Sequence, residues 1–334
     1  MSEFPERVRN HWFVAARSDR IHGVPKRVLL FGAPVVLVRD RNGVVLAMED
    51  RCPHRGAPLS AGRLGPEGLV CPYHGWTFGA EGRCTAMPGA ADSKPIVDVR
   101  VPSLRVVERD GLVWVADAAA SPLPQRILAI DPAQRRFLWQ TRWAAPILEA
   151  QENFLDALHT HTVHPGLVRR AHARRPTGVV LQVGGDGFHV DYSGPPDQSG
   201  LLFRLFESRR TRERAYFSAL SVAQLEYRYA SGWAMWITLC FTPETHRSTH
   251  VFATLHVEGR WAPAWLVRTI VWPFLRQVAR QDRRMLELQE SGREHFPNRR
   301  PVVTPLDVVR PYLEEAWSGK ASLLPPNREL TLYL

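Results

Sequence analysis

The sequence has no long apolar run, almost no lysine and only four cysteines, and each shortage excludes a class of protein. No stretch of about 18 uncharged apolar residues occurs, so we expect no membrane-spanning helix. The most apolar segment, residues 264–278, is interrupted by Arg268, Pro273 and Arg276. The N-terminal residues lack the basic start and apolar core of a signal peptide, so we expect a cytoplasmic protein. Hydrophobic residues make up 45% of the 334 residues and charged residues 23%, which excludes a disordered chain and allows two domains.

The positive charge comes almost entirely from arginine. The chain has 43 Lys plus Arg against 33 Asp plus Glu, a net charge of +10, yet only Lys26, Lys94 and Lys320 are lysines. The arginines are scattered apart from short clusters, and no nucleic-acid-binding motif accompanies them, so we expect no nucleic-acid partner. A basic face is better suited to docking an acidic protein partner.

Short strand-like segments separated by turn residues predict an all-β domain in the first third of the chain. The segments are residues 28–31, 35–38, 44–49, 69–71, 76–78, 104–108 and 112–116. Residues 118–124 then have the composition of a linker. We therefore place a first domain at residues 8–118, a linker at 119–130 and a second domain at 131–334.

The second domain is predicted to mix helices with a sheet. Strand candidates are residues 137–143, 225–229, 233–241 and 249–258, and a helix is expected from Pro146 through Leu158. A C-terminal helix is expected over residues 263–291, with a kink or a break at Pro273. The Pro-rich tail beyond Pro301 is expected to wrap the surface. The fold class is therefore α+β, with helices bracketing a sheet.

The first cluster of chemically active residues lies in the β domain. Cys52 and His54 are followed, sixteen residues later, by Cys71 and His74, so each short loop carries one thiolate and one imidazole. Four cysteines in a cytoplasmic chain suggest a metal before disulfides. A Cys₂His₂ zinc site is the alternative, but zinc motifs usually pair Cys with Cys and His with His. One Cys and one His on each loop instead match a Rieske [2Fe–2S] centre, where two Cys hold one iron and two His the other.

Neighbouring residues indicate a cluster of low reduction potential. High-potential respiratory Rieske proteins have a second cysteine pair that bridges the two loops, and Tyr73 stands where one of these cysteines would be. They also have a Ser where Trp76 stands. Fewer hydrogen bonds to the sulfur atoms lower the potential. Cys84 and Cys240 are expected to be ordinary small buried residues.

The second cluster of chemically active residues is Asn153, Asp156, His159 and His164. On a helix the first three would project from nearly the same face. Pro165 argues that the helix has ended there, so His164 returns from a loop toward that face. Two imidazoles and a carboxylate on one side of a metal form the facial triad of non-heme Fe(II) oxygenases, which leaves positions open for O₂ and substrate.

Together these motifs resemble the oxygenase component of the Rieske non-heme iron oxygenases, over almost the whole chain. The resemblance implies a helix-grip (Bet v1/START-like) catalytic domain, a cluster held by Cys52, His54, Cys71 and His74, and a mononuclear Fe(II) held by His159 and His164. The third ligand in the family is a carboxylate on a C-terminal helix. The matching residue is Asp282, and Glu287 and Glu290 are the rival carboxylates.

The resemblance also assigns roles beside the iron. Asp156 is implied to hydrogen-bond His159 and, across a subunit interface, the His74 of a neighbouring chain, which would couple the two metal sites. The implied assembly is a head-to-tail homotrimer. Asn153 sits near the iron in the family, and a satisfied helix-surface amide is the alternative. His161 is expected to line a loop or pocket.

The expected function is that of a multicomponent monooxygenase. The short length and the sequence after His164 resemble the vanillate demethylase, dicamba demethylase and toluenesulfonate monooxygenase branch. That branch implies O₂, a small aromatic or polycyclic substrate, and electrons from NAD(P)H through a separate reductase, with or without a ferredoxin. The α subunit of a ring cis-dihydroxylating dioxygenase and a Rieske electron-transfer protein are the alternatives.

Aromatic residues supply candidates for the pocket wall and for one rival interpretation. Strand residues alternate between faces, so about half of the wall candidates must point away from the pocket. Trp261, Trp265 and Trp272 are compatible with membrane-surface contact, but such a stretch is more often a core helix. The wall candidates are Phe203, Phe206, Tyr227, Tyr229, Trp233 and Trp236.

Overall fold

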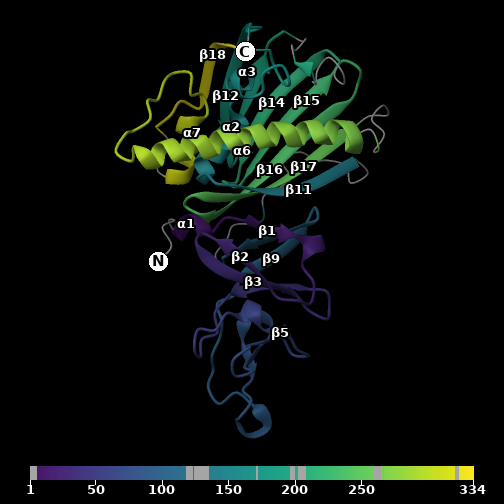
Figure 1. Cartoon of the computed structure of the whole chain (residues 1–334), viewed down its shortest axis with the longest axis vertical. Coiled ribbons are helices and arrows are strands. Elements are labelled where there is room, and N and C mark those ends of the chain that lie inside the picture. Colours follow the sequence, from purple (N-terminus) through teal and green to yellow (C-terminus); the bar gives the residue numbers. More distant parts are fainter. Residues whose placement is uncertain are drawn as a thin grey trace. The chain divides into compact units, whose positions relative to one another are not determined.

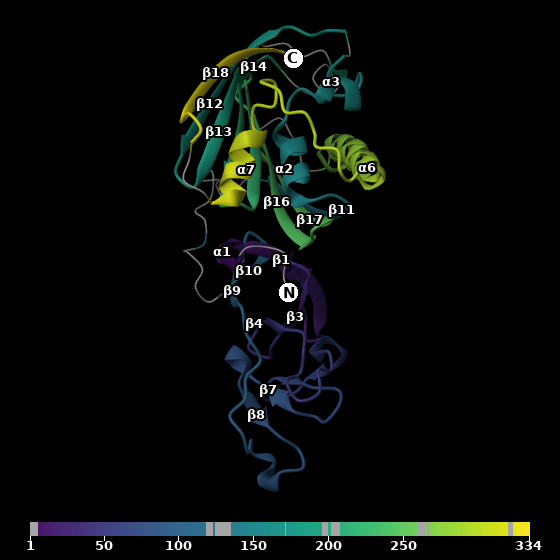
Figure 2. The ribbon, with the colours of Figure 1, turned by 90° about the vertical axis from the view of Figure 1, so that its left-hand side faces the viewer.

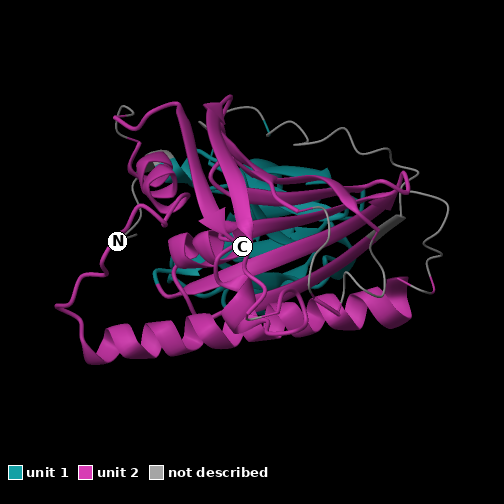
Figure 3. Cartoon of the chain, turned by 90° about the horizontal axis from the view of Figure 1, so that it is seen from above, with its two compact units in different colours: residues 1–123, 242–246 teal, residues 124–241, 247–334 magenta. Residues whose placement is uncertain are grey.

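The protein is described from a computed structural model of the whole chain. The structure describes residues 6–117, 123, 135–170, 172–195, 200–201, 208–258, 265, 267–319 and 323–334. The chain divides into two compact units, residues 1–123 with 242–246, and residues 124–241 with 247–334 (Figure 3). Most of the predicted linker, together with Phe203, Phe206 and Trp261, lies outside the described residues. The boundaries 8–118, 119–130 and 131–334 therefore stay predictions.

The first unit is built from short antiparallel strands, as the sequence predicts (Figure 1). They form three small sheets, ordered β1-β10-β9, β2-β3-β4 and β5-β6-β7-β8. The strands are β1 (Phe13–Arg17), β2 (Lys26–Leu30), β3 (Ala33–Arg39), β4 (Val45–Glu49), β5 (Arg63–Leu64), β6 (Leu69–Val70), β7 (Thr77–Phe78), β8 (Cys84–Ala86), β9 (Arg105–Arg109) and β10 (Leu112–Ala116), and a short helix α1 (Glu6–Arg9) precedes them. Each of the seven predicted segments overlaps one of these strands.

The core of the first unit lies directly behind the cysteine-bearing loops. Leu59, Leu69 and Phe78 are fully buried and pack in one cluster with Cys52 and Cys71. Cys84 belongs to the same cluster, and Cys240 of the second unit is also buried, so both are the buried residues that the sequence predicts. The loops are therefore anchored through their cysteines, while the intervening residues reach the surface.

The second unit is an eight-stranded antiparallel sheet with its long helices on one face (Figure 2). The sheet order is β11-β17-β16-β15-β14-β13-β12-β18. Helix α2 packs against α6, α7 and strands β15 and β17. The strands are β11 (Arg135–Trp143), β12 (Pro176–Gly184), β13 (Gly187–Ser193), β14 (Arg210–Ser218), β15 (Val222–Tyr229), β16 (Ala234–Thr245), β17 (Ser248–Glu258) and β18 (Asn327–Tyr333); the helices are α2 (Ile147–Leu155), α3 (Thr160–Val163), α6 (Trp272–His295) and α7 (Arg310–Ser318). This is the α+β domain that the sequence predicts.

Helix α2 is shorter than expected. It ends at Leu155 rather than continuing through Leu158, because Asp156 is extended (φ −79°, ψ 124°). The Asp156 carboxylate accepts hydrogen bonds from the backbone N–H groups of Leu158 (2.9 Å) and His159 (3.2 Å). An Asp side chain that binds the backbone in this way competes with the helix ladder and favours a turn.

The C-terminal part of the chain is more regular than expected, both around Pro273 and beyond Pro301. Residues 267–271 form a π-helical segment, and α6 then begins with Pro273 in its first turn, where a missing N–H costs little. Beyond Pro301 the chain does not simply wrap the surface. Helix α7 buries Leu313 and Trp317, and β18 pairs with β12 along the edge of the sheet. The sequence did not predict β18, because the prolines before it suggest an irregular tail although its buried and exposed residues alternate.

Of the tryptophans in the membrane-contact interpretation, the structure describes Trp265 and Trp272, which lie in different surroundings. Trp272 packs edge-on against Trp139, with ring centroids 4.4 Å apart, so it is a packing residue. Trp265 is 65% exposed. Among the described residues, no helix is long and apolar enough to span a bilayer.

Candidate metal centres

The two cysteine-bearing loops have the same backbone geometry. In the first loop Cys52 N–H donates to Ala57 O and Gly56 N–H donates to Cys52 O, both at 2.8 Å. In the second loop Cys71 N–H donates to Trp76 O (2.8 Å) and Gly75 N–H to Cys71 O (3.2 Å). Gly56 and Gly75 have φ near +75° and +74°, a conformation that favours glycine. We call residues 52–57 and 71–76 the cluster loops.

The cluster loops bring like donors together. The imidazole centroids of His54 and His74 are 4.6 Å apart, and the Cys52 thiol lies beside the Cys71 thiol. Burial, followed by the neighbouring Cys71, raises the pKa of Cys52 to about 11. The Nδ1 atom of His54 is buried and has no hydrogen-bond partner. Thiols held close in a buried place and an unpartnered imidazole nitrogen fit a group that these atoms would bind.

The spacing of the four donors favours a dinuclear cluster over one zinc ion. Tetrahedral zinc with bonds of about 2.0–2.3 Å would bring all four ligand atoms within about 4 Å of one another. Among the described residues, three or more such ligand atoms lie within 4.8 Å of one another only at a different site, which includes no cluster-loop residue. The four donors of the cluster loops therefore do not converge on one point. Two metals, one bound by the cysteines and one by the histidines, would fit this arrangement.

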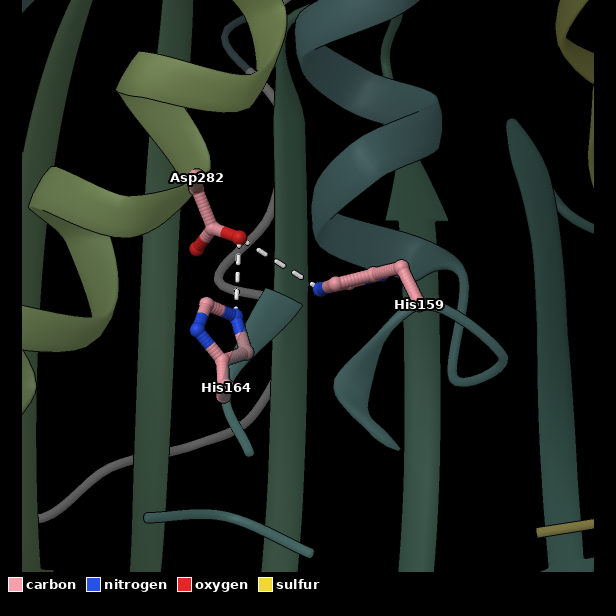
Figure 4. A group of neighbouring side chains, drawn as sticks. All are labelled: His159, His164 and Asp282. Carbon is pink, nitrogen blue, oxygen red and sulfur yellow. Dashed lines mark ion pairs between the residues drawn. The ribbon is translucent and has the colours of Figure 1, made fainter. Parts of the chain in front are cut away.

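That different site joins His159, His164 and Asp282, which we call the triad (Figure 4). Asp282 Oδ1 lies 2.9 Å from His164 Nε2 and 3.4 Å from His159 Nε2. Asp282 comes from α6, while His159 and His164 flank the short helix α3. The structure thus brings together the two histidines and the carboxylate that the resemblance implies. Glu287 instead pairs with Arg283, and Glu290 with Arg293.

Each triad histidine has a polar neighbour at its Nδ1 atom, a hydrogen-bond acceptor for His164 and a carboxylate at ion-pair distance for His159. His164 Nδ1 lies 2.9 Å from Gln281 Oε1, which can only accept, so Nδ1 carries the proton and Nε2 offers its lone pair. His159 Nδ1 lies 3.5 Å from Asp156 Oδ2. His164 Nε2 and Asp282 Oδ1 are buried without a hydrogen-bond partner, although they face each other. Convergent, buried and unpartnered ligand atoms fit a metal ion.

The electrostatics of the triad favour a positive charge. Burial lowers the pKa of His159, but the Asp156 and Asp282 carboxylates outweigh it and raise this pKa to about 9. Burial raises the pKa of Asp282, but the attraction of the carboxylate to the facing imidazoles of His159 and His164 more than offsets this effect, so the pKa is lowered. The carboxylates therefore stabilise a positive charge at the imidazoles, and a cation between these groups would benefit from the same attraction.

A mostly apolar cavity of about 160 Å³ opens beside the triad, and we call it the apolar cavity. Asn153, Asp156 and the triad are among its polar lining residues, and Asn153 Oδ1 is buried without a hydrogen-bond partner. Of the aromatic candidates for the wall, Tyr227 lines it, whereas Tyr229, Trp233 and Trp236 do not. The sequence-based search missed several lining residues on alternating strand positions, among them Trp139, Met235, Ile237 and Leu239. Their period-two spacing was the available signal.

His161 takes the role that its spacing predicts. It is buried, and its Nδ1 lies 2.9 Å from the carbonyl oxygen of Arg170. His161 lines a second cavity and does not belong to the triad. Gln281 was not predicted, because its contact with His164 spans 117 residues and no local pattern marks it.

Two family models match the chain. A Rieske [2Fe-2S] domain matches residues 11–105, and the vanillate O-demethylase oxygenase C-terminal domain matches residues 143–310, half of the chain. The oxygenase component of dicamba O-demethylase from Stenotrophomonas maltophilia is 36% identical over 162 residues, which are 47% of this chain and 48% of that protein. The 5,5'-dehydrodivanillate O-demethylase oxygenase subunit of Sphingobium sp. (strain NBRC 103272 / SYK-6) is 30% identical over 178 residues, 49% of this chain and 41% of that protein. The matches thus span about half, or less, of these relatives.

A solved structure supports the same assignment at the level of the fold. The crystal structure of dicamba monooxygenase bound to dicamba has a TM-score of 0.75 to this chain, at 24% sequence identity. The similarity covers 93% of this chain and 97% of that one. The chain therefore belongs to the Rieske oxygenases that combine a Rieske [2Fe-2S] domain with a vanillate O-demethylase-type C-terminal domain.

Proposed function

We propose that this protein is the oxygenase component of a multicomponent Rieske non-heme iron monooxygenase. It hydroxylates or oxidatively demethylates an aromatic or polycyclic small molecule in the cytoplasm. The observation that carries the proposal is the convergence of His159, His164 and Asp282 in the wall of the apolar cavity, in a chain that also has a Rieske domain. A purely electron-carrying protein has no use for the triad.

The triad residues would hold one ferrous ion and leave its other side open to the apolar cavity. When bound, the iron would supply the activation of O₂, of which one oxygen atom enters the substrate and the other leaves as water. The protein's own part is positional. Gln281 fixes the tautomer of His164, Asp156 orients His159, and the apolar wall holds the substrate while excluding bulk water.

The cluster loops would hold the [2Fe–2S] cluster through Cys52, His54, Cys71 and His74. A separate reductase would take electrons from NAD(P)H and pass them to this cluster, directly or through a ferredoxin. Asp156 would then couple the iron site to His74 of a neighbouring chain in a head-to-tail homotrimer. This coupling is supported by the position of Asp156 beside His159 and by the resemblance.

Metal content separates the oxygenase from a simple electron carrier. An oxygenase holds about three irons per chain, and a Rieske carrier holds about two. We expect Asp282→Ala to lower the iron content of the purified protein by about one per chain and to leave the Rieske electron paramagnetic resonance signal intact. Two irons in the unaltered protein, or zinc in place of the cluster, would contradict the proposal.

The reaction itself is tested by turnover with a surrogate reductase. A panel of methoxylated and methylated aromatic compounds is supplied with NADH and ¹⁸O₂, and products are identified by mass spectrometry. A monooxygenase gives products with a single new oxygen, or demethylated products with formaldehyde. Products with two added hydroxyl groups on one ring would instead assign a dioxygenase.

A further inference from the structure

The second unit contains another cavity, of about 300 Å³, which the proposed reaction does not use. Its lining includes Arg169, Arg175, Arg210 and Arg212 but only one acidic side chain, Glu213. We call it the arginine cavity. It adjoins the apolar cavity, since Arg169, Tyr192, Arg210 and Glu213 line both.

A β-bulge builds the wall between the two cavities. The pairing of β14 with β15 shifts between Arg210 and Arg212, so one extra residue is inserted there. In a regular strand Arg210 and Glu213 would point to opposite faces, but the bulge turns them to the same side. Arg210 Nη1 lies 2.9 Å from Glu213 Oε2, and Arg169 Nη2 lies 3.4 Å from Glu213 Oε1. Two guanidinium groups thus share a single carboxylate.

The outer part of the arginine cavity has positive charge that no acidic side chain balances, although Leu334, whose oxygen accepts from the Arg175 backbone N–H at 2.8 Å, lines the cavity as well. Neither Arg175 nor Arg212 forms an ion pair with any described residue. Both side chains are exposed at the rim, where they can turn toward a ligand. A guanidinium group presents a fork of donors that matches the oxygens of carboxylate and phosphate groups. The charge and donor pattern therefore suit an oxyanion.

His161, which also lines the cavity, requires that the ligand carry a hydrogen-bond donor. It is only 1% exposed, and its Nδ1 must donate to the carbonyl oxygen of Arg170, 2.9 Å away, because a carbonyl has no proton. In the neutral imidazole, Nε2 is then a hydrogen-bond acceptor. This Nε2 atom is buried and has no partner. A ligand that satisfies it must bring a hydrogen-bond donor, and beside the arginines of this cavity an O–H group suits better than a cationic amine.

We propose that the arginine cavity binds an oxyanion that also carries a hydroxyl group. Hydrogen phosphate has this chemistry as a free anion, and a hydroxy-substituted organic acid has it as part of a larger molecule. The arginines would hold the charged oxygens, and His161 Nε2 would accept the hydroxyl proton. Binding needs no turnover, so the proposal stands apart from the proposed oxygenase activity.

Isothermal titration calorimetry of the metal-loaded full chain tests the proposal in low-salt buffer. The probes form two pairs that differ in the hydroxyl group, namely phosphate with sulfate and salicylate with benzoate. We expect the hydroxyl-bearing member of a pair to bind at least about tenfold more tightly than its partner. A preference between phosphate and sulfate indicates a free anion, and a preference confined to the organic pair indicates an organic acid.

Variants at the rim and inside the cavity assign the binding to these residues. The double variant Arg175→Gln/Arg212→Gln should weaken binding of every probe by at least about tenfold. Arg209→Gln is the matched control, because Arg209 is an exposed neighbour that does not line the cavity, and it should change nothing. His161→Phe should remove the preference for the hydroxyl-bearing probe.

Three results would overturn the proposal. The first is the absence of binding by all four probes below about 10 mM. The second is unchanged affinity in the Arg175→Gln/Arg212→Gln variant. The third is a preference for the hydroxyl-bearing probe that persists in His161→Phe. Circular dichroism and iron content of each variant, measured beside the titrations, show that a lost signal comes from the cavity and not from a misfolded chain.

Discussion

At the residue scale, each triad histidine has a polar neighbour at its Nδ1 atom, an amide oxygen for His164 and a carboxylate for His159. Gln281 accepts from His164 Nδ1, and Asp156 lies beside His159 Nδ1 while it also accepts two backbone N–H groups. Such partners fix the tautomer and ring direction of a metal-binding histidine. The ligand set is therefore pre-arranged by residues that do not themselves belong to the triad.

Gln281→Leu should weaken iron binding without changing the ligand set. The substitution removes the acceptor that holds the proton on His164 Nδ1, and loss of such a partner typically costs about 10–100-fold in metal affinity. Anaerobic titration of the iron-free protein with Fe(II) measures the change. Gln281→Glu keeps an acceptor oxygen and serves as the control. Equal affinity of the Leu variant and the unaltered protein would show that Gln281 does not orient His164.

Asp156→Ala should leave both metals bound yet nearly abolish turnover. The carboxylate is not placed as a ligand, but it supports His159 and is the proposed link to the neighbouring cluster. Iron content and the Rieske signal report binding, and product formation reports coupling. Asp156→Asn keeps one acceptor oxygen and so one of the two backbone hydrogen bonds, which makes it the closest variant that removes the charge while retaining part of the turn. Normal activity in the Ala variant would contradict the proposed coupling.

The sequence predicted residues of the two centres because their motifs are local. Cys52 with His54, and Cys71 with His74, each lie on one short loop, and His159 and His164 are five residues apart. Asp282 came only from the resemblance, because nothing in its own spacing connects it to His159. Gln281 and the bulge at Arg210 escaped notice because they depend on contacts between distant segments.

At the scale of elements, a buried ion-pair network joins three helices. Glu149 of α2 is 5% exposed and binds Arg293 of α6 (2.9 Å) and Arg310 of α7 (2.7 Å). Gln289 of α6 donates a further hydrogen bond to Glu149 at 2.9 Å. The network holds α6, which carries Asp282, against α2, which leads to Asp156 and His159. It therefore contributes to the spacing of the triad.

Glu149→Leu should destabilise the fold by about 2–3 kcal/mol, because it removes the buried acceptor of Arg293, Arg310 and Gln289. Each arginine keeps only more exposed carboxylate partners. Denaturant unfolding at neutral pH measures the loss. Glu314→Gln is the control, since Glu314 also pairs with Arg310 but is 52% exposed, and a surface pair contributes about 0–1 kcal/mol. Similar losses in the two variants would show that the buried network is not specially stabilising.

The same carboxylate predicts a loss of stability in acid. Burial alone would raise the pKa of Glu149. The hydrogen bonds and positive charges of Arg293 and Arg310 lower it by more, so the pKa lies below the ordinary value for Glu. A lowered folded-state pKa contributes stability that is present above the unfolded value of about 4.3 and disappears as the pH falls through the folded value. Unfolding free energies between pH 7 and pH 3 should decline less steeply in Glu149→Gln. Parallel pH profiles would refute this assignment.

The elements also show where sequence patterns fail. Helix α2 was predicted too long because hydrophobic spacing cannot register that the Asp156 side chain competes for backbone N–H groups. Strand β18 was missed because prolines before it suggested an irregular tail, although Leu330 and Leu332 alternate within it. Its pairing with β12 closes an edge of the sheet, a non-local contact that no short window contains.

At the scale of the whole molecule, both units were predicted in the right order and class. The β unit follows from short strands between turn residues, and the second unit from long strands with amphipathic helices. The order of strands in the eight-stranded sheet was not predictable in the same way, because it depends on which segments pair across the chain. The resemblance implied a helix-grip domain but no strand order, which only the structure gives.

The proposed head-to-tail ring makes a prediction about mixed assemblies. His74→Ala chains should lack a working cluster, and Asp282→Ala chains should lack a working iron site, so each variant alone should be inactive. If electrons cross from the cluster of one chain to the iron of the next, co-expressed chains with two different affinity tags should recover part of the activity in the doubly purified hybrid. Transfer within a single chain could not rescue either partner, because neither variant then has both centres. A hybrid with the expected iron content but no turnover would therefore rule out electron transfer between protomers.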